Sequence, residues 1–383
     1  MPRHPQFATA LAGMAGSVYS RLAHKLATHP GEVYPLHVGD TWMAPAAGCQ
    51  VSDFSEATHP GLHRYSAPQG RTDLIDAILA RTERTQGLGA ERSEVLVTAG
   101  ATGGLAAVVG AITNPGDEVL ILAPFWPLIA GITRSIGAIP VPVPFFGSVQ
   151  DLESVEKTLK AHLTDRTVAL YLNTPSNPTG QLIPRPWIEA MVAFARRYDL
   201  WILADEVYEH YCWGGEHTYT RPLAPERTFS THSFSKAYGM AGTRCGFTIG
   251  PASAMEATRK ISTHSFYAAP TVAQLCARNA LAGPGDAWAA EAAKAYRTVG
   301  EAAALRLGVA APQGGTFLFF DVAAALDERG LGGFLEDLVE EGVFLAPGES
   351  FGPYPTHVRL CYTAAPPDVV MRGVERVARR LGR

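Results

Sequence analysis

Short apolar runs alternate with helical segments between residues 70 and 250, and this pattern constrains the fold more than any other feature. The strand-like runs are residues 94–98, 118–122, 168–172, 201–204 and 245–249, and residues 104–112 have helical character. Continuous apolar strands separated by helices are typical of a parallel sheet that is covered on both faces. The sequence therefore predicts an α/β fold with a mostly parallel central sheet in a large domain.

The C-terminal part of the chain has a different pattern. An alanine-rich helical stretch at 285–305 is followed by strand-like runs at 316–320 and 358–362. This order indicates a smaller α+β domain. We expect residues 1–45 to form an N-terminal arm and part of the small domain, residues 46–282 the large domain, and residues 283–383 the C-terminal small domain. Residues 1–30 have helical spacing, which Pro30 and Gly31 interrupt.

Composition excludes several classes of protein. A length of 383 residues suffices for two sizeable domains, and 47% hydrophobic with 18% charged residues is typical of a soluble globular protein. The net charge of −4 gives no reason to expect nucleic acid as a partner. No apolar run reaches the roughly 18 residues that a membrane span needs, and histidines interrupt the apolar stretches where a signal peptide would lie. We therefore expect a cytoplasmic location. Five scattered cysteines without a Cys-x-x-Cys motif indicate reduced thiols rather than a disulfide framework or a zinc site, and we expect no metal.

Lys236 lies in the segment Thr-His-Ser-Phe-Ser-Lys, beside Ser233 and Ser235, and Arg244 follows eight residues later. A lysine amine can form a Schiff base with an aldehyde, and hydroxyls with an arginine can hold a phosphate dianion. Pyridoxal 5′-phosphate (PLP) carries both groups. The same local sequence also fits a solvated lysine after a serine-rich turn, but none of the other lysines has this setting.

Polar residues follow two of the strand-like runs, where ligands of open α/β sheets bind. Asp205 ends the run 201–204 and could pair with a pyridinium nitrogen, which would keep the ring an electron sink. A helix-capping carboxylate is the alternative. Asn177, in a proline-rich loop after the run 168–172, and Tyr208 could both donate to a phenolate oxygen. A simple turn is the alternative for Asn177.

Other segments add candidate binding groups. Ala101 and Thr102 open a helix after the run 94–98, where amides and a hydroxyl would meet a phosphate, although a plain strand-to-helix turn fits as well. Trp126 follows the next run and could stack on a planar ring or pack in a core. An arginine inside an apolar strand, as at Arg359, needs an anion if it is buried, and its fork suits a substrate carboxylate. A surface arginine on an edge strand is the alternative.

Taken in order from Gly39 to Arg359, these segments resemble the class I/II aminotransferases, the aspartate-aminotransferase-like group of fold type I PLP enzymes. The resemblance implies that Lys236 forms the Schiff base and shuttles protons, and that Asp205 pairs with the pyridine nitrogen. It implies that Asn177 and Tyr208 donate to the phenolic oxygen and that Trp126 stacks on the ring. It further implies a phosphate cradle made of Ala101, Thr102, Ser233, Ser235 and Arg244. The substrate carboxylate would bind to Arg359, together with Gly39 and Asn177.

Tyr65 has no interpretation from its local sequence, but it matches a family tyrosine that reaches the phosphate of the neighbouring subunit. The resemblance therefore implies a homodimer with active sites at the interface. Three features depart from the family pattern. Ala101 stands where glycine or serine is frequent, and Trp126 stands where many members have tyrosine. Residues 173–176, Asn-Thr-Pro-Ser, differ from the commoner Asn-Pro-x-Asn. None of these changes removes a reacting group.

The sequence predicts a PLP-dependent aminotransferase that moves an amino group between an α-amino acid and a 2-oxo acid. The same residues would also serve a β-elimination lyase or an amino-acid oxidase. A non-catalytic PLP-binding sensor is a further alternative, but the chain before Gly39 is too short for the DNA-binding domain that such sensors carry.

No second basic residue is recognisable for a distal substrate carboxylate, so we expect a neutral or aromatic side chain on the substrate. The aromatic residues Trp42, Phe266 and Tyr267 are candidates for lining its pocket. His264 is a candidate group from the neighbouring subunit.

Overall fold

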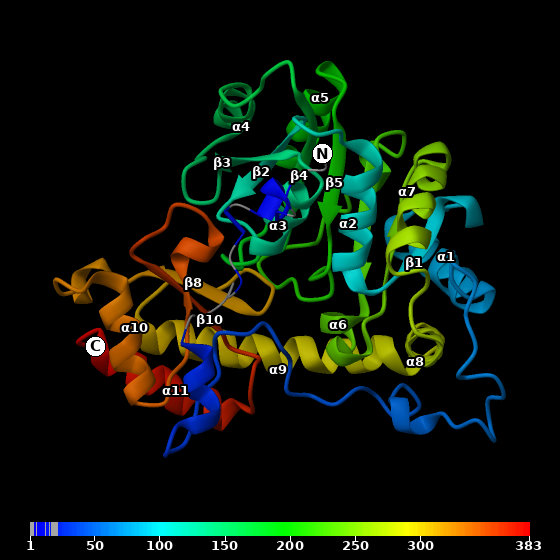
Figure 1. The fold of residues 1–383 in the computed structure, drawn as a ribbon. Coiled ribbons are helices and arrows are strands. Elements are labelled where there is room, and N and C mark those ends of the chain that lie inside the picture. The colour runs from blue at the N-terminus through cyan, green and yellow to red at the C-terminus, as the bar shows by residue number, and fades with distance from the viewer. Residues whose placement is uncertain (1–3, 5, 12, 15, 17–21) are drawn as a thin grey trace.

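The computed structural model describes residues 4, 6–11, 13, 14, 16 and 22–383. It contains two sheets with helices packed around them (Figure 1). The central sheet has seven strands in the order β1-β7-β6-β5-β4-β2-β3. The strands are β1 Val95–Thr98, β2 Glu118–Ala123, β3 Ile139–Pro144, β4 Thr167–Asn173, β5 Trp201–Asp205, β6 Thr228–Ser233 and β7 Gly246–Ile249. All neighbouring pairs are parallel except those of β7, which is antiparallel to both β1 and β6. The predicted mostly parallel α/β sheet is confirmed.

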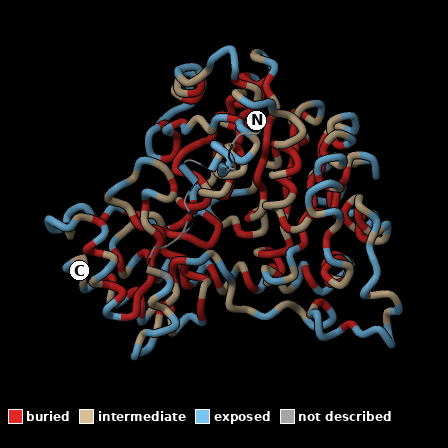
Figure 2. Tube along the Cα trace, in the orientation of Figure 1, coloured by how far each residue is buried: buried red, intermediate tan, exposed pale blue. Residues whose placement is uncertain are grey.

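Helices cover both faces of this sheet, as Figure 1 shows. One face packs on α2 Gly100–Ile112, α3 Pro127–Ser135 and α7 Ala252–Ser265. The opposite face packs on α4 Leu152–Lys160 and α5 Arg185–Arg197, and near β1 and β7 on α1 Thr72–Gln86 and α8 Thr271–Leu281. Because both faces are covered, the strands of the sheet other than β3 are almost wholly buried (Figure 2). This burial explains why β1, β2, β4, β5 and β7 appear in the sequence as continuous apolar runs.

Two strands of the central sheet, β3 and β6, were missing from the sequence-based prediction, as was the two-residue β9, Ala346–Pro347, of the second sheet. β3 alternates prolines with apolar residues, and proline lacks the amide hydrogen that a central strand needs. It is tolerated here because β3 lies at the edge of the sheet. β6 is central but rich in serine and threonine. Its Ser230 donates to the buried carboxylate of Glu206 at 2.6 Å, a partner that no periodicity reveals.

The second sheet has three antiparallel strands in the order β8-β10-β9. They are β8 Phe317–Asp321, β9 Ala346–Pro347 and β10 His357–Cys361, and they pack with α9 Pro284–Leu307, α10 Gly330–Glu340 and α11 Pro367–Arg380. Tyr34 and Leu36 join the core of this unit although they lie far away in sequence. The division of the chain into an arm, a large domain and a small domain at residues 45 and 282 stays a prediction.

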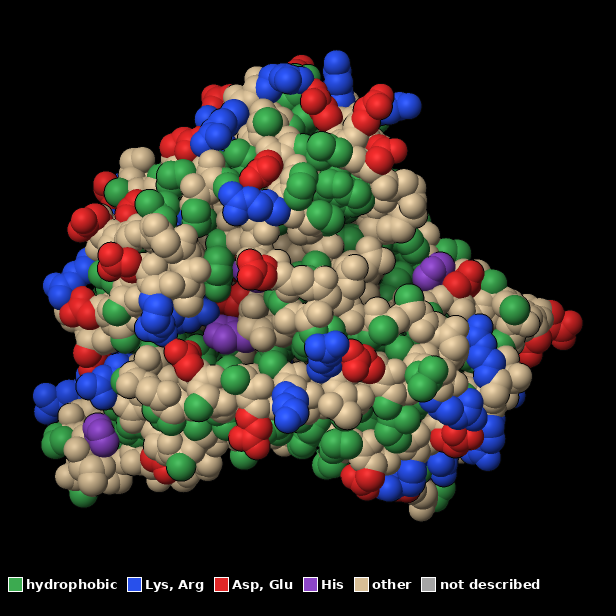
Figure 3. Space-filling model, turned by 180° about the vertical axis from the view of Figure 1, so that it is seen from behind, with side chains coloured by type: hydrophobic (Ala, Val, Ile, Leu, Met, Phe, Trp, Pro, Cys, Tyr) green, Lys and Arg blue, Asp and Glu red, His purple; other side chains and the backbone are tan. Residues whose placement is uncertain are grey.

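The helical spacing of residues 1–30 does not correspond to a long helix in the part of this segment that the structure describes. Two short 3-10 helices are present, Thr9–Leu11 and Ala23–Thr28. Within residues 4–383, apart from the few undescribed positions, no helix combines the length and the apolar character needed to span a bilayer. On the face seen from behind in Figure 3, acidic and basic side chains are interspersed.

Candidate active site

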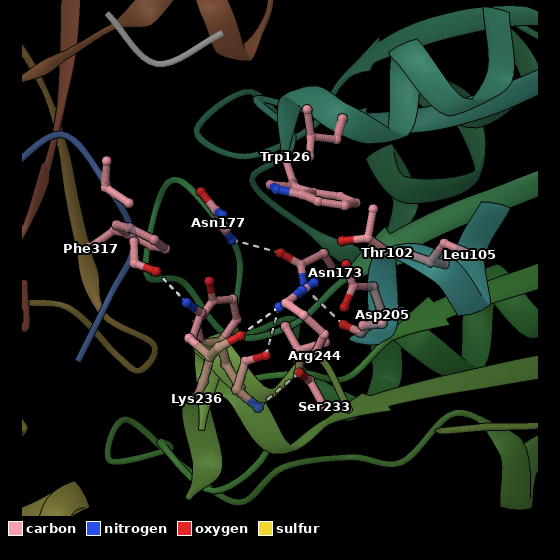
Figure 4. A pocket seen from close by; sticks show the side chains of 18 of the residues that line it. Thr102, Leu105, Trp126, Asn173, Asn177, Asp205, Ser233, Lys236, Arg244 and Phe317 are labelled. Atoms are coloured by element: carbon pink, nitrogen blue, oxygen red, sulfur yellow. Dashed lines mark hydrogen bonds between the residues drawn. The ribbon is translucent and has the colours of Figure 1, made fainter. Parts of the chain in front are cut away.

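A pocket lies where the carboxyl ends of β4, β5 and β6 meet the N-terminus of α2 and residues of the second sheet (Figure 4). It brings together nearly all of the residues that the sequence singled out. The lining includes Gly39, Ala101, Thr102, Trp126, Asn177, Asp205, Tyr208, Ser233, Ser235, Lys236, Arg244 and Arg359. Positions spread over the whole chain thus converge on one cavity. Among the residues assigned to the cofactor or to the substrate carboxylate, Tyr65 does not line this pocket.

Lys236 is carried by α6, a single turn at Phe234–Ala237 that follows β6 directly. The hydroxyl of Ser233 caps this turn by accepting from the Ser235 amide at 3.0 Å. The lysine amine lies in the pocket and donates to the carbonyl oxygen of Gly39. Burial lowers the pKa of the Lys236 amine from its usual value. A lowered pKa favours the neutral amine, which is the form that attacks an aldehyde or accepts a proton.

Asp205 is the last residue of β5, and its side chain is buried. Its Oδ2 accepts a hydrogen bond of 2.7 Å from the Tyr171 hydroxyl, and its backbone oxygen accepts one of 2.8 Å from Asn173 Nδ2. Oδ1 is buried and has no hydrogen-bond partner among the described residues. Burial raises the pKa of Asp205 to about 6. A buried carboxylate oxygen without a partner indicates a place for a cationic or hydrogen-bonding group of a ligand.

The N-terminus of α2 forms one side of an anion cradle. Gly100 opens the helix with a φ of 70°, and a Cβ at this position would lie 2.6 Å from Arg244 Nη2. Only glycine therefore lets the guanidinium approach the helix end so closely. Arg244 also donates to the Ser235 hydroxyl at 3.4 Å. Helix amides, hydroxyls and an arginine on one small surface suit a phosphate.

Arg359 lies in the middle of β10 and is 1% exposed. Its Nη1 donates to Asn177 Oδ1 at 2.9 Å, and its Nη2 donates to the His37 carbonyl oxygen at 2.6 Å. The guanidinium also lies over the ring of Phe317, 4.1 Å from the centroid. Burial and the nearby arginine lower the pKa of His37 to about 4, so this imidazole adds no second cation at neutral pH. The alternative of a surface arginine is excluded.

Several residues expected near the substrate lie elsewhere in the single chain. Trp42 packs edge-on against Tyr296, with ring centroids 4.6 Å apart. Tyr65 is 90% exposed and contacts Tyr267, whose ring centroid is 5.2 Å away. His264 is also exposed and lies outside the pocket. None of Trp42, Phe266 and Tyr267 lines the pocket of the single chain. Their contribution to a pocket shared with a second subunit stays a prediction.

Sequence reasoning missed three residues that shape the site: Tyr171, Asn173 and Phe317. Tyr171 and Asn173 lie two residues apart on β4, so their side chains lie on the same face of the sheet. Register places Asn173 opposite Asp205. The sequence signal for these two residues was a tyrosine and an asparagine two positions apart at the end of an apolar strand. No sequence signal pointed to Phe317, because its neighbours in the sequence do not show that its ring packs against Arg359.

Comparison with known proteins decides the family. The sequence model of aminotransferase class I and II matches residues 40–377. The chain belongs to this family. The aspartate/prephenate aminotransferase of Thermus thermophilus is 33% identical over 333 residues, covering 84% of each protein. The arginine–pyruvate transaminase of Pseudomonas aeruginosa is 32% identical and covers 86% of this chain and 85% of that protein.

The solved structure of the Thermus thermophilus aspartate aminotransferase with maleate superposes on this aminotransferase with a TM-score of 0.89 at 28% identity. It covers 98% of this chain and all of that one. These findings confirm the resemblance, the fold type I architecture, the PLP-dependent transaminase activity and the cofactor.

The pocket of this aminotransferase fits PLP on structural grounds. The buried Asp205 Oδ1 offers an acceptor for a ring nitrogen, and it has no partner within the described chain. The end of α2, with Arg244 and the two serines, offers donors for the phosphate. A Cβ at Gly246 would lie 2.8 Å from the Ala101 amide, so glycine keeps this part of the cradle open. Among the described residues, no cluster of acidic, histidine or cysteine side chains is arranged for a metal ion.

Proposed function

We propose that this pocket is the active site of the aminotransferase and that Lys236 is the residue that carries PLP. The observation that supports this most strongly is the meeting of three groups in one cavity. These are the Lys236 amine, the buried Asp205 oxygen without a hydrogen-bond partner in the described chain and the buried Arg359 guanidinium. Together they offer a covalent anchor, a ring-nitrogen partner and a carboxylate site for an α-amino acid.

When bound, PLP supplies an electron sink for the charge that develops at the substrate Cα. The protein contributes acid–base chemistry and orientation. Lys236 would hold the cofactor through its aldehyde, and its amine, when free and neutral, would serve as the general base for the substrate Cα proton. Asp205 holds a proton on the ring nitrogen by its negative charge. Ser233, Ser235, Thr102, Arg244 and the amide of Ala101 hold the phosphate.

The remaining pocket residues orient the reactants. Asn177 accepts from Arg359 through Oδ1, so its Nδ2 is the group of this amide that can donate to the phenolic oxygen. Tyr208 is the second donor that we assign to that oxygen, and Trp126 stacks on the ring. Arg359 binds the substrate α-carboxylate, together with the Gly39 amide. Holding the reactants in this way converts binding energy into correct alignment of the Cα–H bond.

We expect a substrate with a neutral or aromatic side chain. The cations that line the pocket of one chain are Lys236, Arg244 and Arg359, and each has a role above. A distal carboxylate would be buried without a partner, which costs several kcal/mol. Initial rates with phenylalanine, leucine, alanine, aspartate and glutamate, each with 2-oxoglutarate or pyruvate, test this expectation.

The predicted result is a kcat/KM for at least one neutral amino acid that exceeds the value for aspartate about tenfold, or roughly 1.4 kcal/mol. A tenfold preference for aspartate would contradict the assignment and point to a basic residue from a second subunit. If none of the five amino acids reacts with either oxo acid, the expectation of a common neutral or aromatic substrate is wrong, and the enzyme is specialised for an unusual amine or performs elimination or oxidation.

We also infer that the active unit is a homodimer in the cytoplasm. Tyr65 is 90% exposed, although its family counterpart binds phosphate, and this exposure suits a residue that serves the neighbouring subunit's site. All five cysteines are unpaired in the structure, which suits a reducing compartment.

Complementation tests the shared site. Tyr65→Ala and Lys236→Ala homodimers are each expected to be impaired. After subunit exchange, a mixed dimer should regain one intact site, because the Lys236→Ala subunit supplies Tyr65 to the subunit that keeps Lys236. Mixing Asp205→Asn with Lys236→Ala is the control and should restore nothing, since both defects lie within their own site. A fully active monomer in light scattering would refute the dimer.

A further inference from the structure

The Tyr171 hydroxyl has no role in the function proposed above. Tyr171 is 1% exposed, does not line the pocket, and packs on the side of the sheet covered by α2 and α3. Its hydroxyl donates to Asp205 Oδ2 at 2.7 Å. Tyr171 therefore reaches the candidate site through its hydrogen bond to Asp205.

Strand register explains why this contact forms. In the parallel pair of β4 and β5, Tyr171 lies opposite Leu203, and Asn173 lies opposite Asp205. The tyrosine is thus one step back along the same face of the sheet, and its long side chain reaches diagonally to the carboxylate. Asn173 holds the backbone oxygen of Asp205 at the same time. One face of β4 therefore fixes both the backbone and the side chain of Asp205.

We propose that Tyr171 is a positioning residue for the cofactor ring: it occupies Oδ2 of Asp205, so that Oδ1 is the oxygen presented to the ring nitrogen. The proposal rests on the proposed function, in which Asp205 pairs with that nitrogen. The Asp205 carboxylate also interacts with the Val207 amide. A buried carboxylate held by such hydrogen bonds loses much of its freedom to rotate, and this restriction keeps Oδ1 in place. A tyrosine that only fills space would not need its hydroxyl.

The charges around Asp205 make the hydroxyl important for its ionisation. Burial raises the pKa of Asp205, and Glu206, the next residue in the chain, raises it further. The Tyr171 hydrogen bond lowers this pKa, as does His232 on β6. Lys236 and Arg244 line the same pocket. Without the hydroxyl, the carboxyl would hold a proton more readily and leave less positive charge on the ring nitrogen.

The holoenzyme with Tyr171→Phe tests the proposal, because phenylalanine keeps the packing ring and removes only the hydroxyl. We expect kcat of Tyr171→Phe to fall roughly 10- to 100-fold, because the variant loses a hydrogen bond to a charged group. The KM for the amino acid should change less than about threefold. A second readout is the pH midpoint at which the visible absorbance of the bound cofactor changes. A positive ring nitrogen lowers the pKa of a neighbouring cationic group, so this midpoint should rise in Tyr171→Phe, in the same direction as in Asp205→Asn.

Tyr34→Phe is the matched control. Tyr34 is also buried and also donates to a carboxylate, at 2.6 Å to Glu32, but it lies in the core of the small-sheet unit. It should leave the absorbance midpoint unchanged. The double variant Tyr171→Phe/Asp205→Asn should be no slower than Asp205→Asn within about twofold, because no carboxylate remains to be positioned.

The outcomes distinguish a failure of the positioning role of Tyr171 from a failure of the proposed function. If Asp205→Asn shifts the midpoint and Tyr171→Phe does not, the positioning role is wrong while the proposed function stands. If Asp205→Asn itself leaves the midpoint and kcat unchanged, the role of Asp205 in the proposed function fails as well. A further loss of tenfold in the double variant would also overturn the proposal, since Tyr171 would then act independently of Asp205.

Discussion

Replacing Lys236 by alanine should lower kcat by a factor of about 10² to 10⁴, which is the range that positioned proton transfer contributes to catalysis. The variant loses both the anchor for the cofactor aldehyde and the amine that moves the Cα proton. No other amine can substitute, because Lys236 is the only lysine that lines the pocket within the described chain. Steady-state rates measure the loss. Borohydride reduction of the wild-type holoenzyme, followed by peptide mapping, should place the cofactor label on Lys236.

Lys294→Ala is the matched control for this variant. Lys294 lies exposed on α9, outside the pocket, and its removal should leave kcat within about twofold of wild type. Label on Lys260 or Lys294 in the mapped peptides would overturn the assignment of Lys236. So would a Lys236→Ala enzyme with near-normal turnover.

Asp205→Asn should retain the cofactor but lose nearly all turnover. The phosphate cradle and Lys236 remain to hold PLP, so affinity depends little on this carboxylate. The amide carries no negative charge, however, and cannot stabilise a proton on the ring nitrogen. Removing one partner of a buried charge pair costs about 3–5 kcal/mol, which corresponds to roughly 10² to 10⁴ in kcat. Absorbance of the purified variant reports bound cofactor, and stopped-flow rates report the loss.

Asp286→Asn provides the comparison for a neutralised aspartate. Asp286 is half exposed and pairs with Arg84 at 2.9 Å, far from the chemistry that we assign. This pair should contribute less than about 1 kcal/mol to stability and nothing to kcat. Near-normal kcat in Asp205→Asn would remove Asp205 from the mechanism, whereas loss of bound cofactor would mean that it acts mainly in binding.

The sequence predicted the apolar strands of the central sheet well, because a strand buried on both faces consists mainly of apolar residues. β2, β4 and β5 are almost continuously apolar and were located within one or two residues. β3 and β6 escaped for opposite reasons. The prolines of β3 are compatible with a strand only at an edge, and a strand's place in the sheet is not a local property. The polar residues of β6 are satisfied by partners such as Glu206, which lies on a different segment.

The candidate site was predictable as a set of positions but not as a set of contacts. Local patterns and the family resemblance found Lys236, Asp205 and Arg359, and the structure places all three in one pocket. The hydrogen bond from Tyr171 to Asp205 depends on the register of two strands, which no single segment encodes. The contacts of Tyr65 are not shown by a single chain either, because the function predicted for its exposed ring requires a second subunit.

A half-reaction in the absence of any oxo acid tests the central claim most directly. The holoenzyme is mixed with an amino acid that it accepts, and the visible absorbance of the cofactor and the released products are followed. An aminotransferase should lose the absorbance band once, release one equivalent of 2-oxo acid per active site and retain the amino group on the cofactor. Adding 2-oxoglutarate or pyruvate should then restore the band. Continuous release of ammonia without an oxo acid, with the band preserved, would contradict the account and indicate elimination or oxidation instead.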